Sequence, residues 1–108
     1  MAKIVNIDEN CIEFSDGTVI HCDHKEEGCE YNYADFPQLD DLARNYNFDT
    51  SSLKFEVVED SGFRFGDSPF SMFFVPCYSC QSGYYSSDID VYVNGVLQCS
   101  LDGEVDYI

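Results

Sequence analysis

Short runs in which apolar and polar residues alternate make up most of this chain. Alternation with a period of two is typical of β-strands that bury one face, and turn-forming residues separate the runs. The pattern predicts strands at residues 3–7, 11–14, 18–24, 29–33, 54–59, 63–65, 70–75, 89–93, 96–100 and 105–108. We therefore expect a mainly β protein.

Residue pairs that contain glycine mark the predicted turns. Asp16-Gly17 and Asn94-Gly95 each lie between two alternating runs. Such pairs favour two-residue type I′ hairpins, because both central residues of that turn need a positive φ. Asp102-Gly103 is a third turn candidate. The sequence thus predicts tight hairpins at 16–17 and 94–95.

A two-residue turn at 16–17 also fixes a register for the first hairpin. It places Cys11 opposite Cys22 and Ile12 opposite His21, with Cys22 and His24 on one face and His21 on the other. Directly opposed strand residues have Cβ atoms about 4.5–5.5 Å apart, slightly wide for a relaxed disulfide. We therefore expect the two cysteines to stay reduced.

A single segment carries the signals of a helix. Residues 37–44 begin with Pro37, follow a candidate N-cap at Asp35, and space Leu39 and Leu42 three positions apart. No internal repeat or linker divides the chain. The expected fold is one α+β domain over residues 1–108, a mainly antiparallel β-sheet with one short helix packed on it.

Charge narrows the classes of function. The 108 residues include 21 Asp or Glu and 5 Lys or Arg, for a formal net charge of −16. Such a surface repels phosphate backbones and anionic lipids, so it disfavours direct binding to nucleic acid or membranes and favours a basic protein partner. With 44% hydrophobic and 16% aromatic residues, the chain is too rich in core formers to be disordered. The sequence has neither an apolar span of about 20 residues nor signal-peptide features, and a cytoplasmic location is expected.

The cysteines predict a metal site. Cytosolic thiols are normally reduced, so a small chain with six cysteines is more often a metal binder than a disulfide scaffold. Cys77-Tyr78-Ser79-Cys80 has the spacing of two zinc ligands on a tight turn. We expect one structural zinc held by His24, Cys29, Cys77 and Cys80, with Cys22, Cys11 or His21 as substitutes for one of them. Chelation would then lower the melting temperature.

Two other interpretations of the cysteines stay open. A Cys-x-x-Cys can be a redox motif, although that use requires a helix N-terminus in a βαβ setting, which the pattern around Cys77 and Cys80 does not indicate. Buried cysteines also pack as small hydrophobic residues, an account that suits Cys99 and Cys11.

Catalysis has no support in the sequence. Paired acids such as Asp8-Glu9, Asp40-Asp41 and Glu59-Asp60 lie in polar stretches, where a solvated face is the simpler explanation. The chain has no glycine-rich phosphate loop, no Ser-His-Asp order and no His-Glu-x-x-His helix. We expect a protein that is not an enzyme.

Three stretches carry a resemblance. Residues 12–18 leading to His24, residues 29–36, and Gly83-Tyr84-Tyr85-Ser86-Ser87 resemble a family of small uncharacterised phage and prophage proteins. In that family a His precedes a Cys-Cys-Glu run, and here Gly28 stands in place of the first cysteine. The resemblance implies His24 and Cys29 as ligands and implies no catalytic residue. The acidic chain is also similar to anti-CRISPR proteins that block the type II RNA-guided effector nuclease.

The resulting expectation is an inhibitor that acts in the bacterial host cytoplasm. It would bind the type II CRISPR effector nuclease, or another nucleic-acid-binding host protein, and prevent DNA from loading. Acids at Glu26, Glu27, Asp40 and Asp41 would steer the encounter, and aromatic rings at Tyr31, Tyr33, Tyr84 and Tyr85 would supply affinity. The alternatives are a small metal or redox protein that uses Cys77 and Cys80, and a phage accessory or structural subunit that self-associates.

Overall fold

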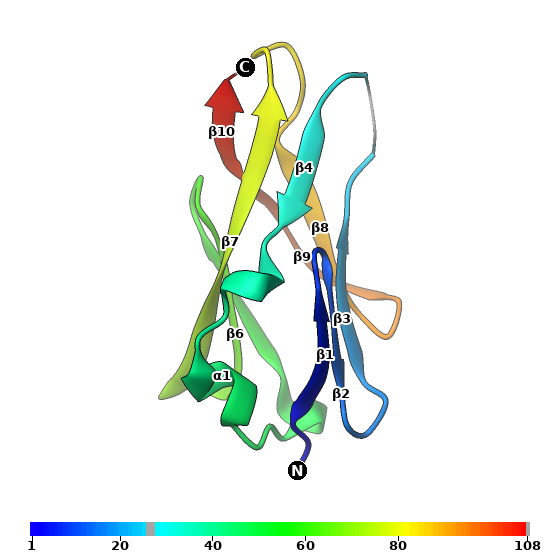
Figure 1. Cartoon of the computed structure of the whole chain (residues 1–108), viewed down its shortest axis with the longest axis vertical. Helices are drawn as coiled ribbons and strands as arrows, with labels where there is room; N and C mark the ends of the chain where they lie inside the picture. Colours follow the sequence, from blue (N-terminus) through cyan, green and yellow to red (C-terminus); the bar gives the residue numbers. More distant parts are fainter. Residues whose placement is uncertain (26–27, 108) are drawn as a thin grey trace.

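Two β-sheets face each other across one hydrophobic core in the computed structural model, which describes residues 1–25 and 28–107 (Figure 1). The first sheet is entirely antiparallel. Its strand order is β1 (Ile4–Asp8), β2 (Cys11–Phe14), β3 (Val19–Asp23), β8 (Asp88–Val93) and β9 (Val96–Asp102). The prediction of a mostly antiparallel β protein with one short helix is confirmed, although the strands form two layers rather than one sheet.

The second sheet is built around β7 (Ser71–Gln81), the longest strand. Its order is β10 (Glu104–Tyr107), β7, β6 (Gly62–Ser68) and β5 (Lys54–Val58), and β4 (Tyr31–Ala34) also pairs with β7. The N-terminal half of β7 pairs with β6, whereas its C-terminal half lies between β4 and the parallel strand β10. This strand therefore connects most of the layer.

Aromatic side chains fill the space between the sheets. Phe14 from the first sheet and Phe63 and Phe65 from the second are fully buried, as is Phe48 from the segment between α1 and β5. The Phe48 ring lies 5.2 Å from that of Phe14 and 5.6 Å from that of Phe65, measured between centroids. Edge-on and stacked pairs of this kind add to the hydrophobic stabilisation of the core.

The predicted register of the first hairpin is wrong by one residue. The N–H of Gly17 donates to the carbonyl of Phe14, which makes a three-residue loop with Gly17 at φ 90°. Ile12 consequently lies opposite Ile20, and both are fully buried. Cys11 lies opposite His21 on the outer face, while Cys22 points into the core. A one-residue shift moves every side chain to the other face, and burial of both isoleucines explains this choice.

The second hairpin follows its prediction. Asn94 and Gly95 have φ values of 49° and 83° and connect Val93 to its partner Val96. Gly103, in contrast, carries the chain from β9 of the first sheet to β10 of the second rather than closing a hairpin. A Cβ at this position would lie 3.1 Å from backbone atoms of Cys77 and Tyr78, which is a tight contact.

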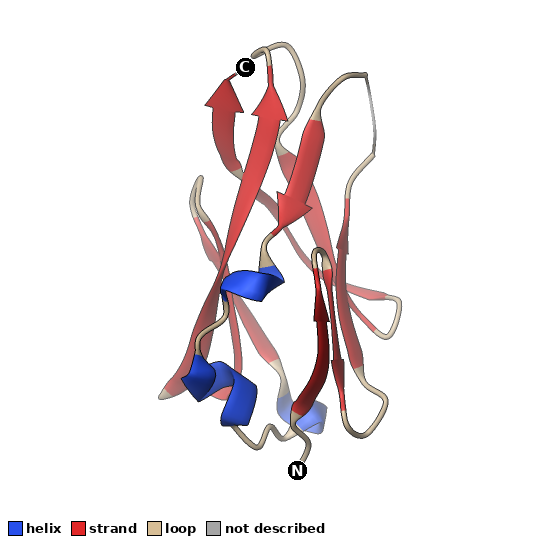
Figure 2. Cartoon of the chain, viewed as in Figure 1, coloured by secondary structure: helices blue, strands red, loops and turns tan. Residues whose placement is uncertain are grey.

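The predicted helix is divided in the structure (Figure 2). Residues Phe36–Gln38 form a 3₁₀ turn, η1, and Asp41–Asn45 form α1, with a second 3₁₀ turn, η2, at Thr50–Ser52. The cap of α1 is Asp40, whose side chain accepts a hydrogen bond from the Ala43 N–H at 3.0 Å, and not Asp35. No helix in the described part of the chain is long and apolar enough to span a membrane.

Candidate protein-binding surface

The four predicted zinc ligands do not come together. Cys77 and Cys80 lie within strand β7 and not on a turn, and strand residues three positions apart point to opposite faces. Cys77 is fully buried between the sheets, whereas Cys80 is half-buried on the outer face. The predicted turn at this motif is therefore wrong, and the strand directs the two sulfurs to opposite faces.

The other two predicted ligands, His24 and Cys29, form no metal-holding cluster with Cys77 or Cys80. His24 borders an open hollow of about 230 Å³ together with Asp23, Lys25, Asp90 and Tyr92, and Cys29 is exposed. Within residues 1–25 and 28–107, no three His, Cys, Asp or Glu side chains are arranged to hold a metal ion. The residues present do not fit the expected site, and zinc content stays a prediction for elemental analysis.

Three thiols instead converge in the core. Cys22 and Cys99 flank Val91 on neighbouring strands of the first sheet, and Cys77 faces them from the second. Burial raises the pKa of Cys77 to about 12, and burial together with the neighbouring thiols raises the pKa of Cys22. These thiols stay protonated at neutral pH and pack as small hydrophobic groups, as the packing interpretation predicted for Cys99.

Serine substitutions separate this packing role from metal binding. We expect Cys77→Ser to lower the free energy of unfolding by about 1–3 kcal/mol, because it places a hydroxyl in an apolar site. Cys80→Ser, at the half-buried outer position, is the matched control and should change it by less than about 0.5 kcal/mol. Urea denaturation measures both. Equal losses for the two variants, with a melting temperature that falls on chelation, would indicate a shared metal.

The outer face of β7 carries an uncharged stripe. Its successive outward positions are Met72, Phe74, Pro76, Tyr78 and Cys80, while Val75, Cys77, Ser79 and Gln81 point into the core. Phe70, in the turn before β7, is 98% exposed, and Phe74 is 41% exposed. Apolar side chains at such exposure mark interaction surfaces when they are contiguous.

Tyrosines from β4 extend this stripe. Tyr33 lies directly opposite Tyr78, with ring centroids 5.5 Å apart, and the Tyr31 ring stacks on that of Tyr33 at 4.9 Å. We define the β7 stripe as Phe70, Met72, Phe74, Pro76, Tyr78, Tyr33 and Tyr31. Tyrosine rings provide large contact area with a polar end, and they are enriched where proteins bind one another.

Carboxylates border the β7 stripe. Tyr78 shares an open hollow of about 240 Å³ with Glu104 and Asp106 of β10. Asp35 accepts a hydrogen bond from Gln38, which also donates to the Tyr78 hydroxyl at 3.2 Å. The basic side chain opposite Phe74, Arg64, is already paired with Glu56. An aromatic centre with a charged rim is the usual anatomy of a protein interface.

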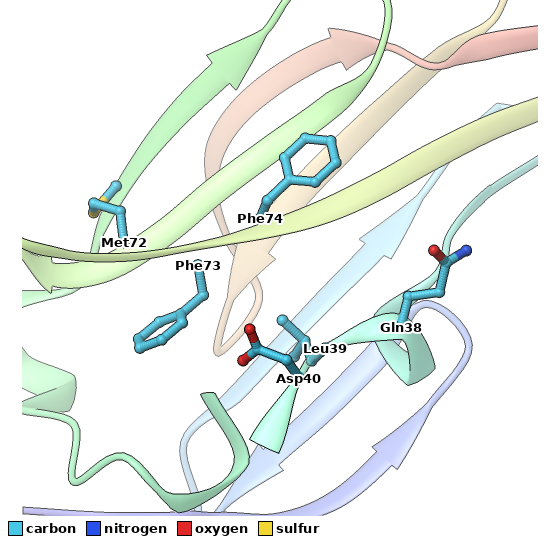
Figure 3. Close-up of a pocket in the computed structure, with 6 residues that line it drawn as sticks. All are labelled: Gln38, Leu39, Asp40, Met72, Phe73 and Phe74. Atoms are coloured by element: carbon cyan, nitrogen blue, oxygen red, sulfur yellow. The ribbon is translucent and has the colours of Figure 1, made fainter. Parts of the chain in front are cut away.

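A second hollow, of about 170 Å³, lies at the other end of the β7 stripe (Figure 3). It is lined by Gln38, Leu39 and Asp40 on one side and by Met72, Phe73 and Phe74 on the other. The rings of Phe73 and Phe74 project to opposite sides of the strand. The hollow therefore lies along the edge of β7, between that strand and the segment leading to α1.

The predicted partner-binding residues have different positions. Tyr31 and Tyr33 belong to the β7 stripe. Asp40 lines its second hollow and caps α1, and Asp41 is the exposed first residue of that helix. Tyr84 is 87% exposed on the loop after β7, whereas Tyr85 is half-buried. Glu26 and Glu27 lie outside the described residues.

Sequence reasoning missed the central residues of this surface. The pattern assigns Met72 and Phe74 only to a strand, treats Tyr78 only as a spacer between two cysteines, and predicts nothing for Pro76. The signal that could have revealed them is a run without charge, because no residue from 68 to 87 is charged in a chain of net charge −16.

The Gly83–Ser87 motif has a structural role. Asn32 donates to the backbone carbonyls of Ser86 at 2.9 Å and Asp88 at 3.0 Å, and the N–H of Tyr85 donates to Gln81 at 2.9 Å. These bonds, partly buried, attach the loop to β4 and β7. A Cβ at Gly28 would lie 2.6 Å from the Tyr85 ring, so the ring occupies the space that a cysteine there would need.

Comparison with known proteins identifies no relative of this chain. No protein-family model, no curated protein and no solved structure matches the chain. The resemblance to phage proteins thus stays an expectation, and the surface itself carries the functional argument.

Proposed function

We propose that this chain is a protein-binding inhibitor whose β7 stripe docks on a basic surface of a nucleic-acid-binding partner. The observation that carries the proposal is the run of uncharged outward positions on β7 in a chain of net charge −16. Rim carboxylates would accelerate the encounter with a basic surface, and the central aromatic rings would hold the complex. A surface occupied in this way is closed to nucleic acid.

The first partner to test is the type II CRISPR effector nuclease, which the sequence resemblance implies. We propose that the protein binds this nuclease without contacting nucleic acid and prevents the target DNA from loading. Metal or redox chemistry at Cys77 and Cys80 has less support, because the two sulfurs lie on opposite faces of β7.

Cleavage by the purified, guide-loaded nuclease tests the proposal. Inhibition should require that the protein is added before the target DNA, and it should weaken as salt is raised. Phe74→Ala should weaken inhibition about 30-fold, which corresponds to a hot-spot loss of about 2 kcal/mol. Leu97→Ala is the matched control, because Leu97 is similarly exposed on the first sheet.

Two results would contradict this proposal. One is the absence of both inhibition and a complex at low salt on a sizing column. The other is a stable homo-oligomer at micromolar concentration that Phe74→Ala dissociates, which would assign the β7 stripe to self-association as a structural subunit.

A further inference from the structure

One edge of β7 is only partly covered. Strand β4 pairs with β7 up to Ala34 and Cys77, and the N–H of Asp35 then donates to the Pro76 carbonyl at 2.8 Å. Beyond this bond the chain enters η1 at Phe36 and no longer follows the edge of β7. No described strand continues the path of β4 beside Met72 and Phe74.

Met72 and Phe74 direct their backbone N–H and C=O groups to the vacant side of β7, which is the side opposite β6. The N–H of Cys77 donates to Ser61 on the β6 side, whereas the Pro76 carbonyl accepts from Asp35 on the β4 side. Peptide groups of successive strand residues point to alternate sides in an antiparallel ladder. Phe74 and Met72, which are two and four positions before Pro76, therefore direct their N–H and C=O groups toward the vacant side.

The neighbouring segment, residues 36–40, does not pair with this edge as a strand. Arg44 donates to the carbonyls of Leu39 at 2.9 Å and Pro37 at 2.8 Å, which fixes the path of the chain between η1 and α1. The space left between this segment and β7 is the hollow of about 170 Å³ that Figure 3 shows. Asp40 lines this hollow and is exposed.

We propose that an extended segment of the partner protein adds to β7 as a strand beside Met72 and Phe74, and that a Lys or Arg of this segment pairs with Asp40. Strand addition of this kind takes its affinity from main-chain hydrogen bonds and its specificity from neighbouring side chains. The inference rests on the proposed function, because it names how the partner engages the β7 stripe.

Charge favours a basic segment over a second copy of this chain. Asp35 and Asp40 lie along the vacant path, and a second copy with net charge −16 would bring the same acids against them. Like charges at such a contact oppose association, whereas a cationic side chain complements them. A basic surface that normally holds nucleic acid would supply this side chain.

Proline substitutions test the backbone contacts. Phe74→Pro and Met72→Pro each remove an N–H that faces the vacant side, and they leave the bonds of β7 to β6 in place, as Pro76 already does two positions later. Phe74→Ala and Met72→Ala are the matched controls that keep the N–H. In nuclease binding, each proline variant should lose at least tenfold more affinity than its alanine control. Equal losses would overturn the proposal.

A peptide experiment separates this proposal from the proposed function. The probe is a synthetic hexapeptide of alternating valine and lysine, and the same peptide with glutamate is its control. The lysine peptide should slow amide hydrogen exchange at Phe74 and Met72 of the wild-type chain at least tenfold, and the glutamate peptide should not. If the lysine peptide protects these amides but the chain does not bind the nuclease, strand addition is supported and the proposed function is contradicted.

Two outcomes of the same experiment would overturn strand addition. One is nuclease inhibition by the wild-type chain while the lysine peptide leaves both amides unprotected. The other is protection of these amides at high protein concentration with no peptide present, which would assign the edge to pairing between two copies of this chain.

Discussion

Replacing Phe48 with alanine should lower the free energy of unfolding by about 3–5 kcal/mol. The Phe48 side chain is 0% exposed, and its ring packs between the two sheets against Phe14, Tyr46, Phe65 and Phe73. Removal of the ring forfeits its transfer free energy and leaves a cavity that several fixed aromatic rings cannot fill. The loss is a large part of the roughly 5–15 kcal/mol that stabilises a typical domain.

Phe70→Ala is the control for this prediction. Phe70 is 98% exposed, so its removal should change stability by less than about 0.5 kcal/mol. Urea denaturation of the two variants, followed by circular dichroism, gives the comparison. Similar stabilities for both would show that Phe48 is not in the core described above.

A methyl group at Gly66 should also be severely destabilising, by at least about 3 kcal/mol. Gly66 lies opposite Met72, and a Cβ there would stand 1.8 Å from the backbone carbonyl oxygen of Ser71. A backbone oxygen within the ladder cannot move away as a side chain can. Gly66→Ala would therefore separate β6 from β7 at the end that carries Phe70.

Gly95→Ala provides the comparison for Gly66→Ala. Gly95 has a positive φ of 83°, but no atom lies within 4 Å of the position that its Cβ would take. Its substitution costs only the backbone strain, about 1–2 kcal/mol. Thermal melts of the two variants compare their stabilities. A smaller loss of stability for Gly66→Ala than for Gly95→Ala would contradict the predicted clash.

The local pattern predicted the strands well and their register less well. Alternation gave β2, β3, β8 and β9 nearly at their observed bounds. It could not distinguish a two-residue loop from a three-residue loop at Gly17, because both contain the same Asp16-Gly17 pair. Burial of Ile12 and Ile20 on opposite strands settles the register, and that is a tertiary effect.

Spacing alone also could not place the cysteines. On a turn, the two cysteines of Cys77-Tyr78-Ser79-Cys80 can point to one metal ion. On a strand they point to opposite faces of the sheet, and the motif lies on strand β7. The sequence could predict the aromatic surface only in part. The residue type alone predicts Tyr31 and Tyr33 as binding residues, whereas the outward position of Tyr78 follows only once β7 is known to continue through the motif.

The pairing of β3 with β8 sets a slow pace for folding. The N–H of Val19 bonds to Asn94 across a separation of 75 residues, so the first sheet cannot close until nearly the whole chain has been brought together. The β2–β3 and β8–β9 hairpins need only local loops and can form within microseconds. Closure of the long loop then limits the rate, and folding in milliseconds to seconds is expected, with the apolar faces of both hairpins exposed in the interval. Dilute refolding should consequently recover more protein than concentrated refolding.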